Sequence, residues 1–159
     1  MSLEKLKTAK DLATLRDELE AQGRKLVFTN GCFDLLHVGH VRYLQQAREL
    51  GDALVVVLNG DESVRALKGA TRPINSEMDR AEVLAGLECV TYVTIDPHVR
   101  LTKLMSEVRP QIYAKGGDYT IDSLNVEERM ALEAAGSDIR ILPLVPGKST
   151  TAIIEKWKN

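Results

Sequence analysis

The sequence predicts an α/β fold, namely a Rossmann-like, doubly wound domain with a five-stranded parallel sheet and helices on both faces. Short apolar runs rich in Val, Ile and Leu alternate with amphipathic helical patterns along the 159 residues. Strands joined by helices form parallel sheets with right-handed crossovers. No repeat, charge block or low-complexity segment interrupts this alternation. We therefore expect a single domain over 1–159, with a lead-in helix in 1–23 and the core in 25–159.

The first half of the chain contains the lead-in helix and two strands. Leucines recur at helical spacing between Thr8 and Gln22, and Gly23 is a typical residue to end such a helix. A buried strand and a second helix follow, and the helix closes at Gly51. The expected elements are a helix at 8–22, a strand at 26–29, a helix at 41–50 and a strand at 53–58.

In the second half, helix signals and apolar runs continue to alternate. Ser76 is placed to cap a helix, with Asp79 three residues later as a partial capping box. Pro110 and Gly136 mark the ends of two later helices. The expected helices are 76–87, 99–108, 126–135 and 150–158, and the expected strands are 90–95, 112–114 and 139–142. Ligands of such sheets bind beyond the carboxyl ends of the strands, so the loops after 29, 58, 114 and 142 are the expected site.

Composition and charge exclude several classes of protein. The chain has 21 Lys and Arg against 23 Asp and Glu, a formal net charge of −2 at pH 7, whereas a general nucleic-acid or anionic-membrane binder needs a basic excess. No apolar run approaches the ~20 residues that span a bilayer. The N-terminus lacks a signal-peptide pattern, and two cysteines give no disulfide framework. We therefore expect a cytoplasmic protein with no nucleic-acid and no membrane partner.

The loop after the first strand carries two of the three histidines. His37 and His40 flank Gly39 where the chain enters a helix. Free backbone N–H groups and the positive end of the helix dipole favour anions there, and imidazoles can donate to phosphate oxygens. The pattern therefore predicts a phosphate site that stabilises charge during phosphoryl chemistry. The plain alternative is that one histidine caps the helix and the other packs.

Two other candidate motifs, a zinc site and a P-loop, do not have the residue spacing that these sites require. Cys32, His37 and His40 resemble sparse zinc ligands, but the chain contains no second ligand pair, so we expect no protein metal site. Cys32 then reads as a small buried hydrophobic residue. Gly147-Lys148-Ser149 resembles the end of a P-loop, but Leu142 stands where the first glycine is required.

Two motifs together resemble the cytidylyltransferase-like nucleotidyltransferase superfamily: Gly31-x-Phe33-Asp34-x-x-His37-x-Gly39-His40 and Ser149-Thr150-Thr151. More closely, the chain resembles the adenylyltransferase domain of ADP-heptose synthase. The segments that carry this resemblance are 29–40, 67–69 with 72–75, 115–119 and 149–154. Because these 159 residues leave no room for the kinase domain that usually accompanies that family, we expect a stand-alone adenylyltransferase.

The resemblance implies transfer of an adenylyl group from ATP to D-glycero-β-D-manno-heptose 1-phosphate, with release of pyrophosphate, by direct in-line attack on the α-phosphorus. It also implies Mg²⁺ with the ATP, and a homodimer or higher homo-oligomer. The catalytic residues that it implies are His37, His40 and Lys68. The implied nucleotide-binding residues are Asn30, Gly31, Cys32, Phe33, Asp34, His37, Gly39, His40, Lys115, Gly116, Gly117, Asp118, Ser149, Thr150 and Thr151. The implied sugar-phosphate-binding residues are Asn59, Asp61, Lys68, Arg72 and Arg80.

Each of these assignments has a plainer alternative. Lys68 and Arg72 read equally as solvated surface residues, 115–119 as an ordinary turn, and 149–151 as a helix cap. His98 matches no motif position and is expected at the surface.

Departures from relatives bear on the substrate. No arginine stands in 144–148 or 87–90, where cytidylyltransferases for glycerol or ethanolamine phosphate usually have one. Another nucleotidyltransferase of the superfamily, such as a glycerol-phosphate cytidylyltransferase or an FAD synthetase, and a non-catalytic nucleotide-binding module remain the alternative functions.

Overall fold

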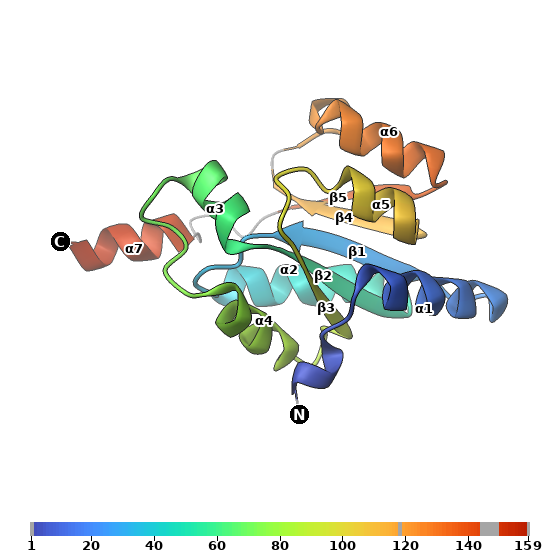
Figure 1. The fold of residues 1–159 in the computed structure, drawn as a ribbon, viewed down its shortest axis with the longest axis horizontal. Helices are drawn as coiled ribbons and strands as arrows, with labels where there is room; N and C mark the ends of the chain where they lie inside the picture. Colours follow the sequence, from blue (N-terminus) through green and yellow to red (C-terminus); the bar gives the residue numbers. More distant parts are fainter. Residues whose placement is uncertain (1, 118, 144–149, 159) are drawn as a thin grey trace.

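The computed structural model describes residues 2–117, 119–143 and 150–158. In this part of the chain, five parallel strands form one sheet in the order β3-β2-β1-β4-β5 (Figure 1). The predicted Rossmann-like α/β fold is therefore confirmed. The strands are β1 (Leu26–Gly31), β2 (Ala53–Asn59), β3 (Tyr92–Asp96), β4 (Ile112–Gly116) and β5 (Asp138–Leu142).

The helices connect the strands much as the sequence predicts. They are η1 (Ser2–Lys5), α1 (Ala9–Ala21), α2 (Val38–Glu49), α3 (Asp61–Lys68), α4 (Glu77–Ala85), α5 (Thr102–Val108), η2 (Ile121–Ser123), α6 (Val126–Ala134) and α7 (Thr150–Lys158). Two helices start away from their predicted positions: α5 begins three residues after position 99, and α2 begins three residues before position 41. Its first turn includes the segment that carries Gly39 and His40.

Alternating side chains of the strands point into two separate cores. Val27 on β1 and the even-numbered residues of β2 pack with α2 and α4 on one face. Leu26 and Phe28 on β1 pack with α1, α5 and α6 on the other face. Because both faces are covered, β2 is apolar and buried from Ala53 to Leu58, as expected for a central parallel strand.

The lead-in segment packs into this architecture. Leu6 forms a parallel bridge with Val93 at the β3 edge of the sheet, and Leu12 on α1 is fully buried. The Arg16 side chain on α1 donates from Nε to the backbone oxygen of Arg109 at 2.8 Å, which ties α1 to the end of α5.

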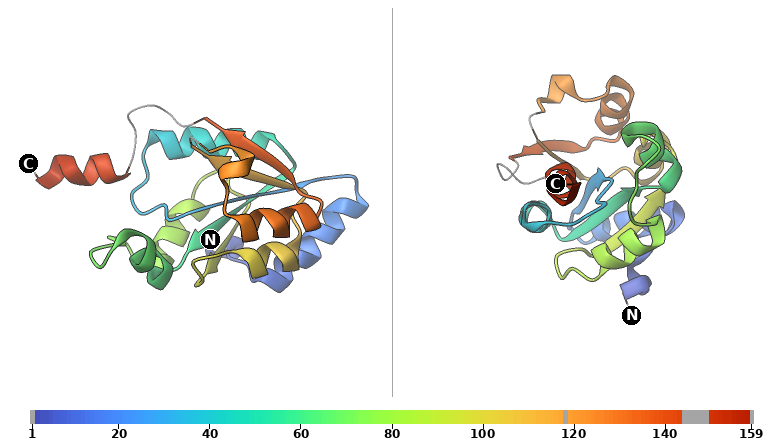
Figure 2. Two further views of the ribbon diagram at one scale, coloured as in Figure 1. Left: turned by 90° about the horizontal axis from the view of Figure 1, so that it is seen from above. Right: turned by 90° about the vertical axis from the view of Figure 1, so that its left-hand side faces the viewer.

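The order of the strands places a switch point beside β1. The chain runs outward from β1 through β2 to β3, and then crosses back to β4 on the other side of β1. The loops that follow β1 and β4 therefore diverge, and this divergence opens a crevice at the carboxyl ends of the strands. The C-terminal helix α7 projects from this same end of the molecule (Figure 2).

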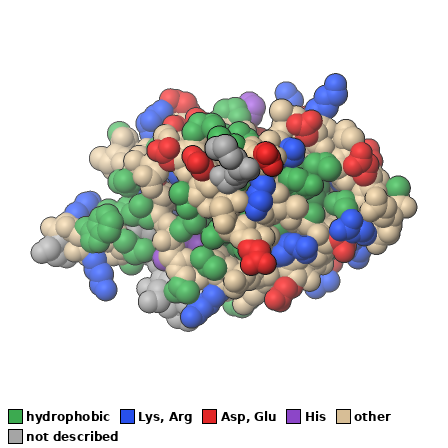
Figure 3. Space-filling view, turned by 90° about the horizontal axis from the view of Figure 1, so that it is seen from below, with side chains coloured by type: hydrophobic (Ala, Val, Ile, Leu, Met, Phe, Trp, Pro, Cys, Tyr) green, Lys and Arg blue, Asp and Glu red, His purple; other side chains and the backbone are tan. Residues whose placement is uncertain are grey.

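The surface shows no marked separation of charge on the face seen from below, where acidic and basic side chains are interspersed (Figure 3). No helix in the described part of the chain combines the length and the apolar character that a membrane span requires.

Candidate functional site

A cavity of about 510 Å³ lies at the carboxyl ends of the strands. Its lining comes from the loop after β1, the ends of β2 and β4, the segment around the end of α3, and the first turn of α7. The predicted site residues that line it are Asn30, Gly31, Cys32, Phe33, Asp34, His37, Gly39, His40, Asn59, Lys68, Arg72, Lys115 and Thr151. Among the predicted residues, Gly116, Gly117, Asp61 and Arg80 are not part of the lining. Asp118 and Ser149 lie outside the described residues, as does the side chain of Thr150.

The two histidines form a reciprocal capping box at the start of α2. His37 is the N-cap residue, and its Nδ1 accepts a hydrogen bond from the backbone N–H of Gly39 at 3.1 Å. The Nδ1 of His40 accepts from the backbone N–H of His37 at 3.2 Å. The ring centroids are 3.9 Å apart and the ring planes differ by 31°. Both histidines therefore cap the helix, rather than one capping and one packing, and both line the cavity. The phosphate site predicted at this position stays a prediction.

This arrangement fixes where the imidazole protons are. A ring nitrogen that accepts a hydrogen bond carries no proton, so in each neutral ring the proton is on Nε2. Burial, and then the neighbouring His37, lowers the pKa of His40 to about 4. His40 is therefore a neutral N–H donor at physiological pH, and a phosphate group in the cavity would meet an N–H dipole there rather than an imidazolium.

The loop between β1 and α2 has a constrained backbone. Phe33 has a φ of 46°, in the left-handed region that side chains other than glycine rarely adopt. Its ring leaves no space above Gly31, where an added Cβ would lie 2.8 Å from a ring carbon of Phe33. The ring also meets His40 edge to face, with centroids 5.4 Å apart. Gly31 and Phe33 thus set the position of the histidine pair.

Asp34 anchors a second loop to the first. Its buried carboxylate accepts hydrogen bonds from the Arg72 Nε at 2.8 Å, the Ile74 N–H at 2.7 Å and the Asn75 N–H at 2.9 Å. Burial acts to raise the pKa of Asp34, but these N–H groups and the Arg72 charge outweigh it, so the pKa is lowered. Asp34 thereby holds the segment that carries Arg72 against the loop between β1 and α2.

Arg80 has a structural position that the sequence did not predict. Its guanidinium is fully buried and forms an ion pair with Asp61 at 2.8 Å. It also donates to the backbone oxygens of Asn75, Cys32 and Asn59 at 2.7–3.0 Å. The expected role of Arg80 and Asp61 in binding a sugar phosphate stays a prediction. In the structure these two charges pair with each other, and Arg80 ties together the ends of β1 and β2 and the start of α4.

Several lining residues were missed by the sequence analysis. Tyr43 on α2 donates its hydroxyl to the Ala114 oxygen at 3.1 Å and lies 2.6 Å from the Thr29 hydroxyl, so it links α2 to β1 and β4. Burial raises the pKa of Tyr43 to about 12, so the phenol stays protonated. Arg100, before α5, and Glu128, on α6, also line the cavity. A helix pattern gives Tyr43 a core role only, and nothing local distinguishes Arg100 or Glu128 from surface charges.

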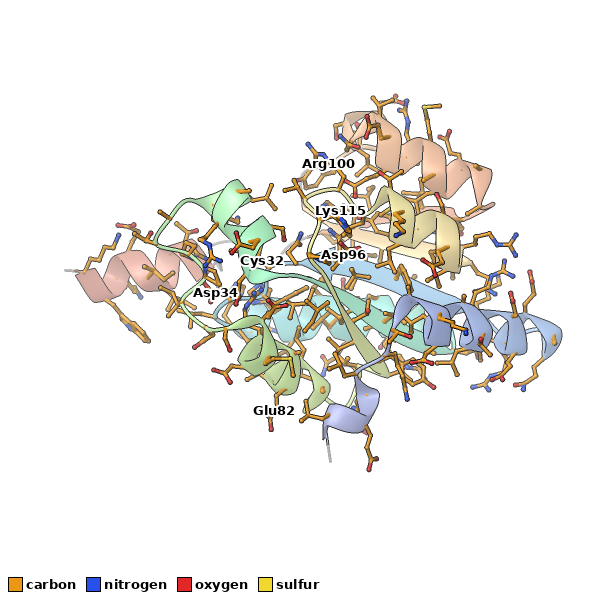
Figure 4. All side chains as sticks on the ribbon, in the orientation of Figure 1. Cys32, Asp34, Glu82, Asp96, Arg100 and Lys115 are labelled. Carbon is orange, nitrogen blue, oxygen red and sulfur yellow. The ribbon has the colours of Figure 1, made fainter. Side chains whose placement is uncertain are left out.

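Three further basic side chains of the lining come from two parts of the chain. Lys68 is the last residue of α3 and Arg72 follows this helix, whereas Lys115 lies in β4. In Figure 4, Cys32 and Asp34 lie toward α3 and α4, while Arg100 and Lys115 lie near α5 and α6. His98 is exposed at 63% of its side chain and pairs with Asp96, away from this cavity.

The described residues contain no group of three or more His, Cys, Asp or Glu side chains placed to hold a metal ion. Burial raises the pKa of the Cys32 thiol, which therefore stays protonated at neutral pH. Neither a zinc centre nor a cysteine thiolate is formed by these residues.

Comparison with known proteins places this geometry in context. The model of the cytidylyltransferase-like family matches residues 28–156. The "Bifunctional protein HldE" of Pelobacter propionicus is 49% identical over 152 residues, which are 96% of this chain and 31% of that protein. The protein of the same name from Geobacter sulfurreducens is 47% identical, again over 96% of this chain and 31% of its own length. The chain thus spans about a third of the length of these relatives.

Solved structures share the fold. A lipopolysaccharide core biosynthesis protein from Thermoplasma volcanium has a TM-score of 0.64 and 28% identity, and the match covers 77% of this chain and 98% of that one. A pantoate-beta-alanine ligase from Francisella tularensis has a TM-score of 0.56 at 15% identity, covering 96% of this chain and 76% of that one. The second likeness concerns the fold alone.

Proposed function

Because the chain belongs to the cytidylyltransferase-like family and is a nucleotidyltransferase, we propose that it joins ATP to D-glycero-β-D-manno-heptose 1-phosphate, giving ADP-heptose and pyrophosphate. Support for the heptose comes from the relatives named HldE, which are 47–49% identical. A solved relative with 28% identity is named for lipopolysaccharide core biosynthesis, a use that fits an activated heptose.

The observation that carries the proposal is the histidine pair at the start of α2. Two imidazoles, each with its proton on Nε2, line one cavity together with Lys68, Arg72 and Lys115. Preplaced N–H donors of this kind stabilise the charge that develops on phosphate oxygens in a transition state. Fixed donors lose little by reorganisation when the charge appears.

The proposed reaction needs no nucleophile from the protein. A phosphate oxygen of the sugar 1-phosphate attacks the α-phosphorus of ATP, and a new P–O bond forms as the bond to the β-phosphate oxygen breaks. Pyrophosphate leaves with that electron pair. His37 and His40 donate hydrogen bonds to the α-phosphate and the leaving group, while Lys68 and Arg72 neutralise the charge on pyrophosphate.

The first turn of α7 would close the nucleotide site. Thr151 lines the cavity, and a helix start offers backbone N–H groups to an anion. We include Ser149 and Thr150 in this part of the proposal on the motif that they form with Thr151.

Magnesium enters the proposal as part of the nucleotide. Mg²⁺ is commonly held by one or two carboxylates and by substrate phosphates, and the described residues offer no cluster that would hold it alone. A cavity whose described residues form no carboxylate cluster fits an ion that enters already bound to ATP. When bound, Mg²⁺ neutralises charge on the phosphate oxygens.

The experiment that tests this function is a steady-state assay of pyrophosphate release with purified protein. ATP and CTP are each paired with heptose 1-phosphate, mannose 1-phosphate and glycerol 3-phosphate, with and without Mg²⁺. We expect the highest kcat/KM for ATP with heptose 1-phosphate and no turnover without Mg²⁺. Faster turnover of CTP with glycerol 3-phosphate would replace the adenylyltransferase assignment by a cytidylyltransferase one.

A further inference from the structure

Strands β1 and β4 separate where the cavity at the carboxyl ends of the strands begins. β1 pairs with β4 as far as Phe28 and Tyr113, whereas its pairing with β2 continues to Gly31. Asn30 lies two residues after Phe28 and lines the cavity. Alternate residues of a strand point to the same face of a sheet, and Phe28 and Tyr113 belong to the same core. Asn30 therefore follows this core on the same face, where the crevice opens.

A side-chain hydrogen bond crosses the gap between the two strands. The Tyr113 hydroxyl donates to the Oδ1 of Asn30. Tyr113 is 4% exposed, and its ring packs in the core against residues of α5 and α6. In the described part of the chain, neither of these two side chains forms another hydrogen bond. A rigid, buried ring thus holds one end of the Asn30 amide.

The direction of this hydrogen bond determines how the Asn30 amide is turned. Burial, and then the negative charge of Glu128, raises the pKa of Tyr113, so the phenol keeps its proton and acts as a donor. An asparagine amide has an acceptor oxygen on one side and a donor NH₂ group on the other. With Oδ1 bonded to Tyr113, the NH₂ group is the part of Asn30 that is left for a ligand in the cavity.

We propose that Tyr113 is a positioning residue for the nucleotide, and that it acts by holding Asn30 with its NH₂ group toward the cavity, where this group donates to an oxygen of ATP. The inference deepens the proposed function and rests on it. An inverted amide would place its carbonyl oxygen against the phosphate oxygens, so acceptor would face acceptor. It would also leave the buried phenol proton without an acceptor, which is costly. The Tyr113 hydroxyl therefore selects the orientation that binds an anion.

The other groups of the lining favour the same orientation. The histidine pair offers N–H donors at Nε2, and Lys68, Arg72 and Lys115 line the same cavity. The carboxylate of Asp34 is already engaged by Arg72 and by backbone N–H groups. A triphosphate has many acceptor oxygens and matches a lining of donors. An NH₂ group at Asn30 adds one more donor to this set.

The test is a double-mutant cycle made of Tyr113→Phe, Asn30→Ala and the double variant. The Kd for ATP with Mg²⁺ is measured by calorimetric titration without any sugar phosphate, and each variant is melted thermally. The control is Tyr92→Phe, which removes a hydroxyl from a tyrosine on β3 that does not line the cavity.

We expect Tyr113→Phe and Asn30→Ala each to raise the Kd about threefold to tenfold, as for loss of one ordinary hydrogen bond. The double variant should bind ATP within twofold of Asn30→Ala, because Tyr113 has no effect once the amide is gone. Tyr92→Phe should leave the Kd unchanged. A double variant whose Kd rises by the product of the two single effects would overturn the proposal. So would an unchanged Kd in Tyr113→Phe, which would show that the hydrogen bond only joins the strands.

Asn30→Asp tests the orientation of the amide separately. It keeps an acceptor for the Tyr113 hydroxyl and puts an oxygen in place of the NH₂ group, so we expect a larger loss of ATP affinity than in Asn30→Ala. Binding as tight as in the wild type would overturn the assigned orientation. A wild-type protein that does not bind ATP would overturn the proposed function and this inference with it. A cycle that behaves as expected in a protein that does not use heptose 1-phosphate would overturn only the proposed acceptor.

Discussion

The Nδ1 of His40 accepts a hydrogen bond from the backbone N–H of His37 at 3.2 Å. The Nδ1 of His37 accepts from the N–H of Gly39 in the same way. In an ordinary capping box, Ser or Thr at the N-cap and Glu or Gln at the third helical position accept these backbone hydrogen bonds. Here the Nδ1 atoms of His37 and His40 accept them, and each neutral ring keeps its proton on Nε2. The same two side chains therefore cap the helix and, in the proposed function, donate to phosphate.

Substitutions that preserve the cap separate these functions. Asn is a good N-cap residue and Gln suits the third helical position, so His37→Asn and His40→Gln keep an acceptor for the same backbone N–H groups. We expect each to lower kcat by ~10²- to 10³-fold, as for loss of one transition-state donor, with little change in Tm. The alanine variants should lose in addition about 1 kcal/mol of stability. Steady-state kinetics and thermal melts of all four variants measure both effects. A folded His40→Gln protein with wild-type kcat would show that His40 only caps the helix.

The low pKa of His40 predicts how stability depends on pH. The folded value is about 4, because of burial and the neighbouring His37, against 6.5 for an ordinary histidine. The unfolded chain therefore binds the proton more readily, so this contribution to stability is complete above pH 6.5 and is lost as the pH falls toward 4. Thermal melts between pH 7.5 and 4.5 should show a steeper loss of Tm for the wild type than for His40→Gln. Parallel curves would contradict the assignment of a neutral, buried ring.

Asp34→Asn tests the anchor between the two loops. The asparagine amide places an NH₂ donor where a carboxylate oxygen accepted hydrogen bonds from Arg72, Ile74 and Asn75, so donor faces donor. Breaking a buried pair of this kind costs about 3–5 kcal/mol, and the freed loop should raise KM for ATP. The control is Asp52→Asn. Asp52 also accepts a backbone N–H, that of Lys25 at 2.8 Å, but it lies before β2 at the opposite end of the sheet. Urea unfolding and the KM for ATP are measured for both variants. An unchanged KM in Asp34→Asn would show that Asp34 contributes to stability but not to ATP binding.

Arg80→Met tests whether this residue stabilises the fold or contacts the sugar phosphate. Loss of the guanidinium leaves the Cys32, Asn59 and Asn75 oxygens without a buried donor, so we expect a loss of about 3–5 kcal/mol in the free energy of unfolding. Arg65→Met, at an exposed arginine on α3 that pairs with Glu62, should change it by less than about 0.5 kcal/mol. The folded Arg80→Met fraction should keep the wild-type KM for the sugar phosphate. A stable variant with a raised KM would restore the substrate contact that the sequence suggested.

Local patterns predicted the parts of the molecule that depend on local physics. The alternation of strands and helices follows from apolar periodicity, and the histidine pair follows from its spacing at a helix start. Even here, the start of α2 at Val38 rather than at position 41 depends on hydrogen bonds from imidazoles, which are unusual capping groups.

Roles that depend on distant partners could not be predicted in this way. The guanidinium of Arg80 pairs with Asp61 and donates to the carbonyls of Asn59 and Cys32, which are 21 and 48 positions earlier in the chain. Local patterns show only a basic residue near a helix start. Arg100 and Glu128 meet only because α5 and α6 pack together on one face of the sheet. Sequence motifs therefore located the end of the cavity that carries the histidine pair, and the tertiary structure located the end that carries Arg100 and Glu128.

We propose that the histidine pair assists direct transfer to the sugar phosphate without a protein nucleophile. The stereochemical course of the reaction at the α-phosphorus is the most direct test of this proposal. The protein is supplied with one diastereomer of ATP that carries sulfur on the α-phosphorus, together with heptose 1-phosphate and Mg²⁺, and the configuration of the product is determined by ³¹P NMR. We expect inversion at the α-phosphorus, as for one in-line displacement. Retention would show two displacements through a covalent enzyme intermediate and would contradict it.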